Sequence, residues 1–221
     1  MILTPSTPDA LQQRATKLAG CTFQDIAEQV GLPCPTHLTY AKGWLGQCLE
    51  ILLGSTAGSQ PVPDFEQLGI ELKTIPVLPT LKPLESTYVC SAPLPFRDTE
   101  WQTSRVYHKL RCVLWVPIVT RSGQPFQLRR LGQAFLWTPT TEQGQHLQAD
   151  WEELTEYLTL GHFIGLSARL GNYLHIRPKA MTSQVRIITT DSEGDALETI
   201  PKGFYLRSTF TEQILKSQYA G

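Results

Sequence analysis

The sequence has little of what marks a membrane or secreted protein. Its longest apolar run covers only residues 113–119, whereas a membrane-spanning helix needs about 20 residues. The first twenty residues show no basic start followed by an apolar run, so we expect no secretion signal. The five cysteines are widely spaced and form no CxxC pair, which argues against a zinc cluster and a disulfide framework. We therefore expect a cytoplasmic protein with no membrane partner.

Two common catalytic signatures are also missing. No serine stands in a G-x-S-x-G context, and no glycine-rich Walker loop is present. Neither a nucleophile-elbow hydrolase nor a P-loop ATPase is indicated, so any dependence on ATP would have to come from a partner.

Acidic residues are absent from two long stretches. Residues 101–141 contain six Lys and Arg and no Asp or Glu, and residues 157–190 contain a further four basic residues. The net charge is only -1, but nucleic-acid binding depends on where charge is placed rather than on its sum. The two basic stretches could together line a groove for phosphates, or they could be ordinary solvated surface.

Hydrophobic periodicity and turn residues predict one α/β unit with two lobes around a cleft. Pro8 marks a first helix that Gly20 follows, and Thr22 with Asp25 resembles a capping box for a second helix that Gly31 closes. His108 follows a strand-like start in a basic stretch. Further helices are expected at 43–53, 142–160 and 211–219, the last capped by Thr211. Strands are expected at 69–77, 87–90, 113–119, 173–177 and 200–206, the last of them interrupted at Gly203.

The segment that suggests chemistry is Asp64 followed by Glu71 and Lys73, a D-x6-E-x-K pattern. Side chains alternate along a strand, so Glu71 and Lys73 should share one face. A turn at Leu68 and Gly69 would bring the Asp64 carboxylate beside Glu71. Two carboxylates suit Mg²⁺, which polarises a phosphoryl oxygen and lowers the pKa of bound water. The alternative interpretation of E-x-K is a surface ion pair.

Several runs of residues resemble the MutH family of mismatch-repair endonucleases. They are Lys-Gly-Trp-Leu-Gly at 42–46, Leu-Glu-Ile-Leu-Leu-Gly at 49–54, Gly-Ile-Glu-Leu-Lys-Thr-Ile-Pro at 69–76, Ile-Arg-Pro-Lys-Ala at 176–180 and Gly-Phe-Tyr-Leu at 203–206. The likeness extends from about Ala10 to the end of the chain. It implies a restriction-endonuclease-like fold, a mixed sheet flanked by helices, in a single endonuclease domain over 1–221. The C-terminal part, from about 160 to 221, would carry the base-reading loop.

The resemblance also implies an activity and its partners. The family nicks the unmethylated strand of hemimethylated GATC sites, 5′ of the G, with Mg²⁺. MutL recruits and activates it after MutS has found a mismatch. Because the motif occurs once in 221 residues, we expect a monomer that makes one cut.

By the same resemblance, individual residues receive roles. Asp64, Glu71 and Lys73 are expected to be catalytic with Glu50 beside them, and Asp64, Glu71 and Glu50 to hold the metal. DNA contacts are expected from Lys42, His108, Lys109, Arg177, Pro178, Lys179 and Tyr205, with Lys42 and Lys109 near the scissile phosphate.

Arg177, Pro178 and Lys179 should lie on a turn after a strand and read guanine, with Tyr205 against the adenine. Each of these roles has a competing interpretation. Arg177 and Lys179 could simply contact phosphates, Tyr205 could pack in the core, and His108 could have a structural role.

Two other functions compete with this hypothesis. One is a type II restriction enzyme that cuts both GATC strands, which would normally act as a dimer. The other is a non-catalytic DNA-binding module that retains a relic acid cluster. Both can be separated from a nicking enzyme by their products.

Overall fold

The computed structural model describes residues 2–36, 43–58, 60–163, 166, 169–179 and 186–219. The chain divides into two compact units. The first comprises residues 1–85, 111–138 and 214–221, and the second comprises residues 86–110 and 139–213. No helix within the described ranges combines the length and apolar character that crossing a bilayer requires.

The first unit is built on a mixed four-stranded sheet. Strand β1 (Glu71–Val77) pairs in parallel with β3 (Val113–Val119), and β3 pairs antiparallel with the short strands β4 (Arg130–Leu131) and β5 (Phe135–Trp137). β3 is buried along almost its whole length because it has neighbours on both edges, as its continuous apolar run predicts. β1 is left at one edge of the sheet.

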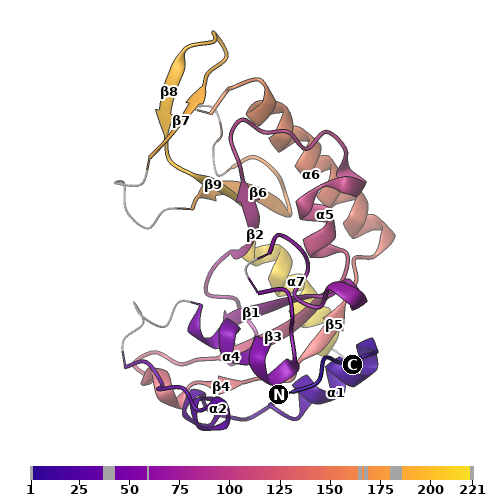
Figure 1. The fold of residues 1–221 in the computed structure, drawn as a ribbon, viewed down its shortest axis with the longest axis vertical. Helices are drawn as coiled ribbons and strands as arrows, with labels where there is room; N and C mark the ends of the chain where they lie inside the picture. The colour runs from indigo at the N-terminus through magenta and orange to yellow at the C-terminus, as the bar shows by residue number, and fades with distance from the viewer. Residues whose placement is uncertain are drawn as a thin grey trace. The chain divides into compact units, whose positions relative to one another are not determined.

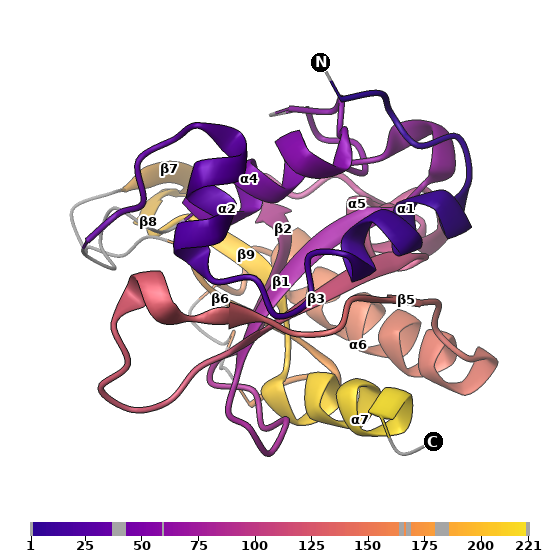
Figure 2. The ribbon, with the colours of Figure 1, turned by 90° about the horizontal axis from the view of Figure 1, so that it is seen from below.

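Helices cover this sheet. Figure 2 shows α1 (Pro8–Thr16), α2 (Phe23–Val30) and α4 (Trp44–Leu53) on one face. On the other face lies the C-terminal part of α7 (Ser208–Tyr219), which belongs to this unit from Ile214 onward. The predicted capping box is confirmed: the hydroxyl of Thr22 accepts from Asp25 N, and the Asp25 carboxylate accepts from Thr22 N. The expected mixed sheet flanked by helices is thus confirmed.

The second unit contains a three-stranded antiparallel sheet in the order β2 (Thr87–Ala92), β9 (Lys202–Leu206), β6 (Leu174–Pro178). α5 (Arg105–Leu110) packs against β2, and α6 (Thr141–Thr159) packs against β6 (Figure 1). A separate hairpin joins β7 (Ile187–Thr190) to β8 (Ala196–Thr199).

Four expectations about elements were wrong. The strand-like start before His108 is the helix α5, which begins there because the Ser104 hydroxyl accepts from Tyr107 N. The first helix ends at Thr16 rather than near Gly20, whose N–H pairs instead with Leu131 O. α7 begins at Ser208, and Thr211 lies inside it with its hydroxyl donating back to carbonyls of the preceding turn. β9 passes through Gly203 without interruption.

Candidate functional site

The edge position of β1 explains how Asp64 is held. Glu71 N donates across the sheet to Cys112 O, so the N–H of the next residue, Leu72, points to the opposite, unpaired edge. The Asp64 carboxylate accepts that N–H at 2.8 Å through Oδ2. The carboxylate therefore lies against the backbone beside Glu71, as the sequence predicts.

A tight turn brings Asp64 back to this edge. Phe65 and Ile70 exchange two backbone hydrogen bonds around the 3-10 turn η1 (Glu66–Leu68). Gly69 closes the turn at φ +64°, a conformation that L side chains rarely adopt. The Ser55 hydroxyl, in the loop after α4, donates to Asp64 O at 2.7 Å. Backbone and side chain of Asp64 are both fixed.

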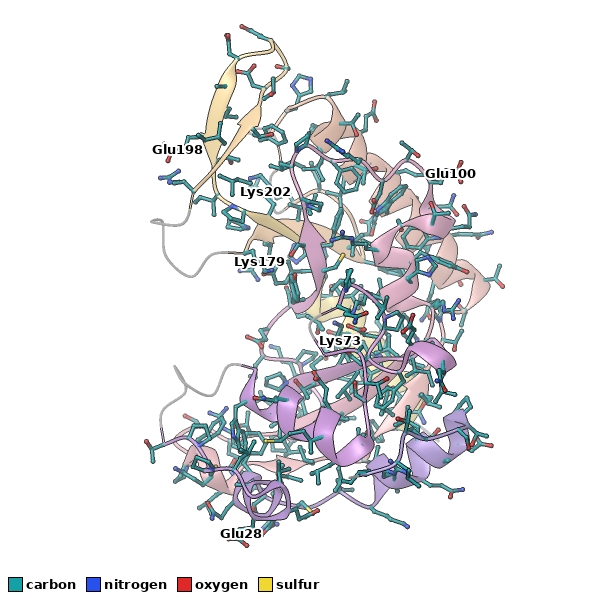
Figure 3. The ribbon with its side chains drawn as sticks, in the orientation of Figure 1. Glu28, Lys73, Glu100, Lys179, Glu198 and Lys202 are labelled. Carbon is teal, nitrogen blue, oxygen red and sulfur yellow. The ribbon has the colours of Figure 1, made fainter. Side chains whose placement is uncertain are left out.

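Glu71 and Lys73 form an ion pair on one face of β1. Lys73 Nζ lies 2.6 Å from Glu71 Oε1, and the side chains retain 12% and 4% of their exposure, respectively. The predicted shared face is confirmed. The ion pair of the competing interpretation is present, but it is largely buried rather than exposed at the surface. Figure 3 labels Lys73 on this strand.

The donor set fits a hard divalent cation. Asp64 and Glu71 offer carboxylate oxygens at the same end of β1, and Mg²⁺ is usually bound by one or two carboxylates, waters and substrate phosphates. Over the described ranges, no three His, Cys, Asp or Glu side chains are grouped to hold a metal. Glu50 is half-buried on α4, where its carbonyl accepts from Gly54 N and Ser55 N. Its role as a third metal ligand stays a prediction.

The predicted base-reading residues gather on one face of the sheet in the second unit. Arg177 and Pro178 are the last two residues of β6, rather than part of a turn, and Lys179 follows directly. The Arg177 guanidinium lies 5.7 Å from the Tyr205 ring centroid. Tyr205 is half-buried rather than a core residue.

Two of the other predicted DNA contacts lie on the helix α5. His108 is exposed and Lys109 half-buried on α5. Lys42 lies outside the described residues, so the structure says nothing of its position.

Sequence reasoning missed the residues that support these groups. Ser55 anchors Asp64, and Tyr88 and Ser91 on β2 contact Lys179. Gly203 on β9 lies between the Tyr88 and Tyr205 rings. The Ser91 hydroxyl carries no sequence signal because its partner is 88 residues away. Ser55 lies in a loop whose sequence has no pattern that points to its partner.

Known proteins resemble this chain over nearly its whole length. The sequence model of a family described as "DNA mismatch repair enzyme MutH" matches residues 53–150. The DNA mismatch repair protein MutH of Vibrio campbellii is 46% identical over 216 residues, which cover 97% of this chain and 96% of that protein. The MutH protein of Escherichia coli O127:H6 is 42% identical over 220 residues, covering 99% and 96% of the two chains. The chain therefore belongs to the MutH family of DNA mismatch repair enzymes, which are endonucleases.

Proposed function

We propose that the chain is a Mg²⁺-dependent endonuclease that nicks the unmethylated strand of hemimethylated GATC sites, 5′ of the G, in methyl-directed mismatch repair. The observation that carries the proposal is the Asp64 carboxylate held on Leu72 N–H, next to the nearly buried Glu71–Lys73 pair. Oxygen ligands for a metal ion beside a cationic group are a combination that suits phosphodiester hydrolysis.

Asp64 and Glu71 are the proposed ligands of Mg²⁺, with Glu50 as a further acidic member. When bound, the ion supplies Lewis-acid polarisation of a phosphoryl oxygen and lowers the pKa of a bound water. The Lys73 ammonium orients the attacking water and offsets charge that grows on the phosphate. Once it has given up its own proton, the neutral amine can take the proton of that water and become the ammonium again. Lys42 and Lys109 neutralise phosphates near the scissile bond, and His108 contacts DNA.

Sequence recognition is assigned to the second unit. Arg177 and Lys179 donate to guanine N7 and O6 in the major groove, and Pro178 fixes the backbone between them. Tyr205 faces the adenine, where an N6-methyl group would clash or displace a hydrogen bond. The contact of the Arg177 guanidinium with the Tyr205 ring supports a joint role for these two residues.

The physiological setting is part of the same proposal. The chain acts in the cytoplasm as a monomer and a single endonuclease domain on double-stranded DNA. MutL activates it after MutS has bound a mismatch. A single D-x6-E-x-K motif in 221 residues supports one cut per binding event.

A cleavage assay tests the proposal. Supercoiled plasmid with one GATC site, in unmethylated, hemimethylated and fully methylated form, is incubated with Mg²⁺ or with EDTA. Nicked circles should accumulate from the first two substrates with Mg²⁺, and fully methylated plasmid should stay intact. Linear product at early times would indicate a restriction enzyme, and binding without cleavage would indicate a non-catalytic module. Equal cleavage in EDTA would exclude metal dependence.

A further inference from the structure

A β-bulge decides which side chains of β2 face Tyr205. Tyr88 pairs with Tyr205 and Cys90 with Phe204, so the extra residue Val89 is inserted in β2. In a regular strand, residues three apart point to opposite faces. The bulge instead places Tyr88 and Ser91 on the same face.

This face carries the proposed base-reading residues. Register pairs Tyr205 with Tyr88 on one side and with His175 on the other. The Tyr88 and Tyr205 rings meet edge to face, with centroids 5.3 Å apart. In the next row, Ser91 and Arg177 flank Gly203. The opposite face bears Phe204, which packs through Phe96 toward Trp151 of α6.

Ser91 joins two of these groups. Its Oγ accepts from Lys179 Nζ at 2.8 Å and lies 2.9 Å from the Tyr88 hydroxyl. The same ammonium lies 5.3 Å from the centroid of the Tyr88 ring. A lysine side chain has several rotatable bonds and is normally mobile at a surface. Here a hydroxyl and an aromatic ring define where its charge lies (Figure 3 labels Lys179).

Gly203 makes this arrangement possible. A Cβ at this position would come within 3.0 Å of Tyr88 Cε2, 3.1 Å of Cys90 O and 3.3 Å of Tyr205 Cε2. Two of these atoms belong to rings and one to backbone, so the two tyrosines could not keep their present positions around a side chain. The central strand β9 therefore carries no side chain between Ser91 and Arg177.

We propose that Ser91 is a positioning residue for sequence recognition, which holds the Lys179 ammonium in place for a base edge. The inference rests on the proposed function, in which Lys179 reads the GATC site. A lysine side chain that is already held in place before DNA binds loses less conformational entropy when it contacts a base. The resulting gain in binding free energy applies only at sites where a base acceptor lies at the fixed position of the ammonium. Ser91 should thus affect discrimination between sites more than general affinity.

A double-mutant cycle on discrimination tests this role. Nicking rates are measured on a GATC duplex and on duplexes with one altered base pair, for Ser91→Ala, Lys179→Ala and the double variant. Ser91→Ala should lower the GATC preference by about fivefold to tenfold, the effect of one hydrogen bond. Ser91→Thr, which keeps a hydroxyl, should restore most of it. The double variant should match Lys179→Ala, because Ser91 acts only through that ammonium.

Controls separate positioning from folding. Ser192→Ala removes an exposed hydroxyl from the same unit and should leave discrimination unchanged. Thermal unfolding of Ser91→Ala and its affinity for DNA without a GATC site should match the parent protein.

The outcomes distinguish the two levels of the proposal. If Lys179→Ala lowers only GATC cleavage but the Ser91 effect adds to it in the double variant, Ser91 does not act through Lys179 and the inference is wrong. If Lys179→Ala weakens cleavage of every sequence equally, Lys179 contacts phosphate, and its base-reading role fails together with the role of Ser91.

Discussion

Lys73 Nζ lies 2.6 Å from Glu71 Oε1 on the edge strand of the first sheet, and water reaches little of either side chain. Among the named strands of the described residues, β1 pairs only with β3, so at Leu72 its other edge can bind Asp64 while one face carries this pair. Each of the two charged groups is paired with the other in the folded chain. A substitution of either residue should therefore change the free energy of unfolding as well as the proposed catalysis.

Removing one partner of this pair should cost stability. Lys73→Met removes the ammonium that pairs with the nearly buried Glu71 carboxylate, and we expect a loss of about 1 to 3 kcal/mol. Glu71→Gln alone removes the other charge, and in the double variant Glu71→Gln with Lys73→Met neither residue of the pair is charged, so part of that loss should be recovered. Denaturant unfolding of the four proteins measures the coupling energy. Additive effects would show that the two groups do not support each other.

Substitution of Asp64 should separate folding from cleavage. Asp64→Asn keeps an oxygen that can accept from Leu72 N–H but removes the negative charge. Its stability should stay near that of the parent protein, while nicking falls by about a thousandfold, or roughly 4 kcal/mol of transition-state stabilisation. Asp64→Ala should lose both stability and nicking activity. DNA affinity in EDTA is the control, and full nicking by Asp64→Asn would exclude Asp64 as a metal ligand.

Tyr205 should control the response to adenine methylation. Tyr205→Ala removes the ring that would meet the N6-methyl group, so the ratio of nicking between unmethylated and fully methylated GATC should fall by about tenfold, or 1.4 kcal/mol. Tyr205→Phe keeps the ring and tests the hydroxyl alone. An unchanged ratio in Tyr205→Ala would move methylation sensing to another residue.

Asp150 should be important for stability. It is buried on α6, and its carboxylate accepts from the N–H groups of Asn172, Tyr173 and Leu174 at 2.6–2.9 Å, which fixes the start of β6. Asp150→Ala leaves these donors unpaired and should cost about 3 kcal/mol or more. The melting temperature should then fall by about 6–12 °C. The exposed Glu153, on the same helix, provides a matched control as Glu153→Ala.

Cys48 should resist thiol reagents in the folded protein. Burial, with the nearby Cys34, raises the pKa of this thiol to about 11, so at pH 8 only about one molecule in a thousand carries the thiolate. Mass spectrometry after brief alkylation should find Cys48 unmodified and the partly exposed Cys21 and Cys112 modified. Rapid native modification of Cys48 would show that its surroundings open.

The features that the sequence predicted correctly are interactions between residues that lie close together in the chain. Thr22 and Asp25 cap α2 because both partners lie three residues apart, and alternation along 71–73 places Glu71 and Lys73 on one face. The short turn before β1 predicts the return of Asp64, since only a few residues separate the interacting groups. These interactions depend on nearby residues, and the sequence alone determines them.

Contacts between distant segments were decided by the tertiary structure. Strand register decides the bulge at Val89 and the contact of Ser91 with Lys179. Loop closure decides the hydrogen bond from Ser55 to Asp64. Strand register is set by how whole elements pack, and a shift of one residue would reverse every face. The sequence by itself therefore determined the local structure of the proposed catalytic segment, whereas the supports that orient the proposed base-reading residues appeared only when the chain was folded.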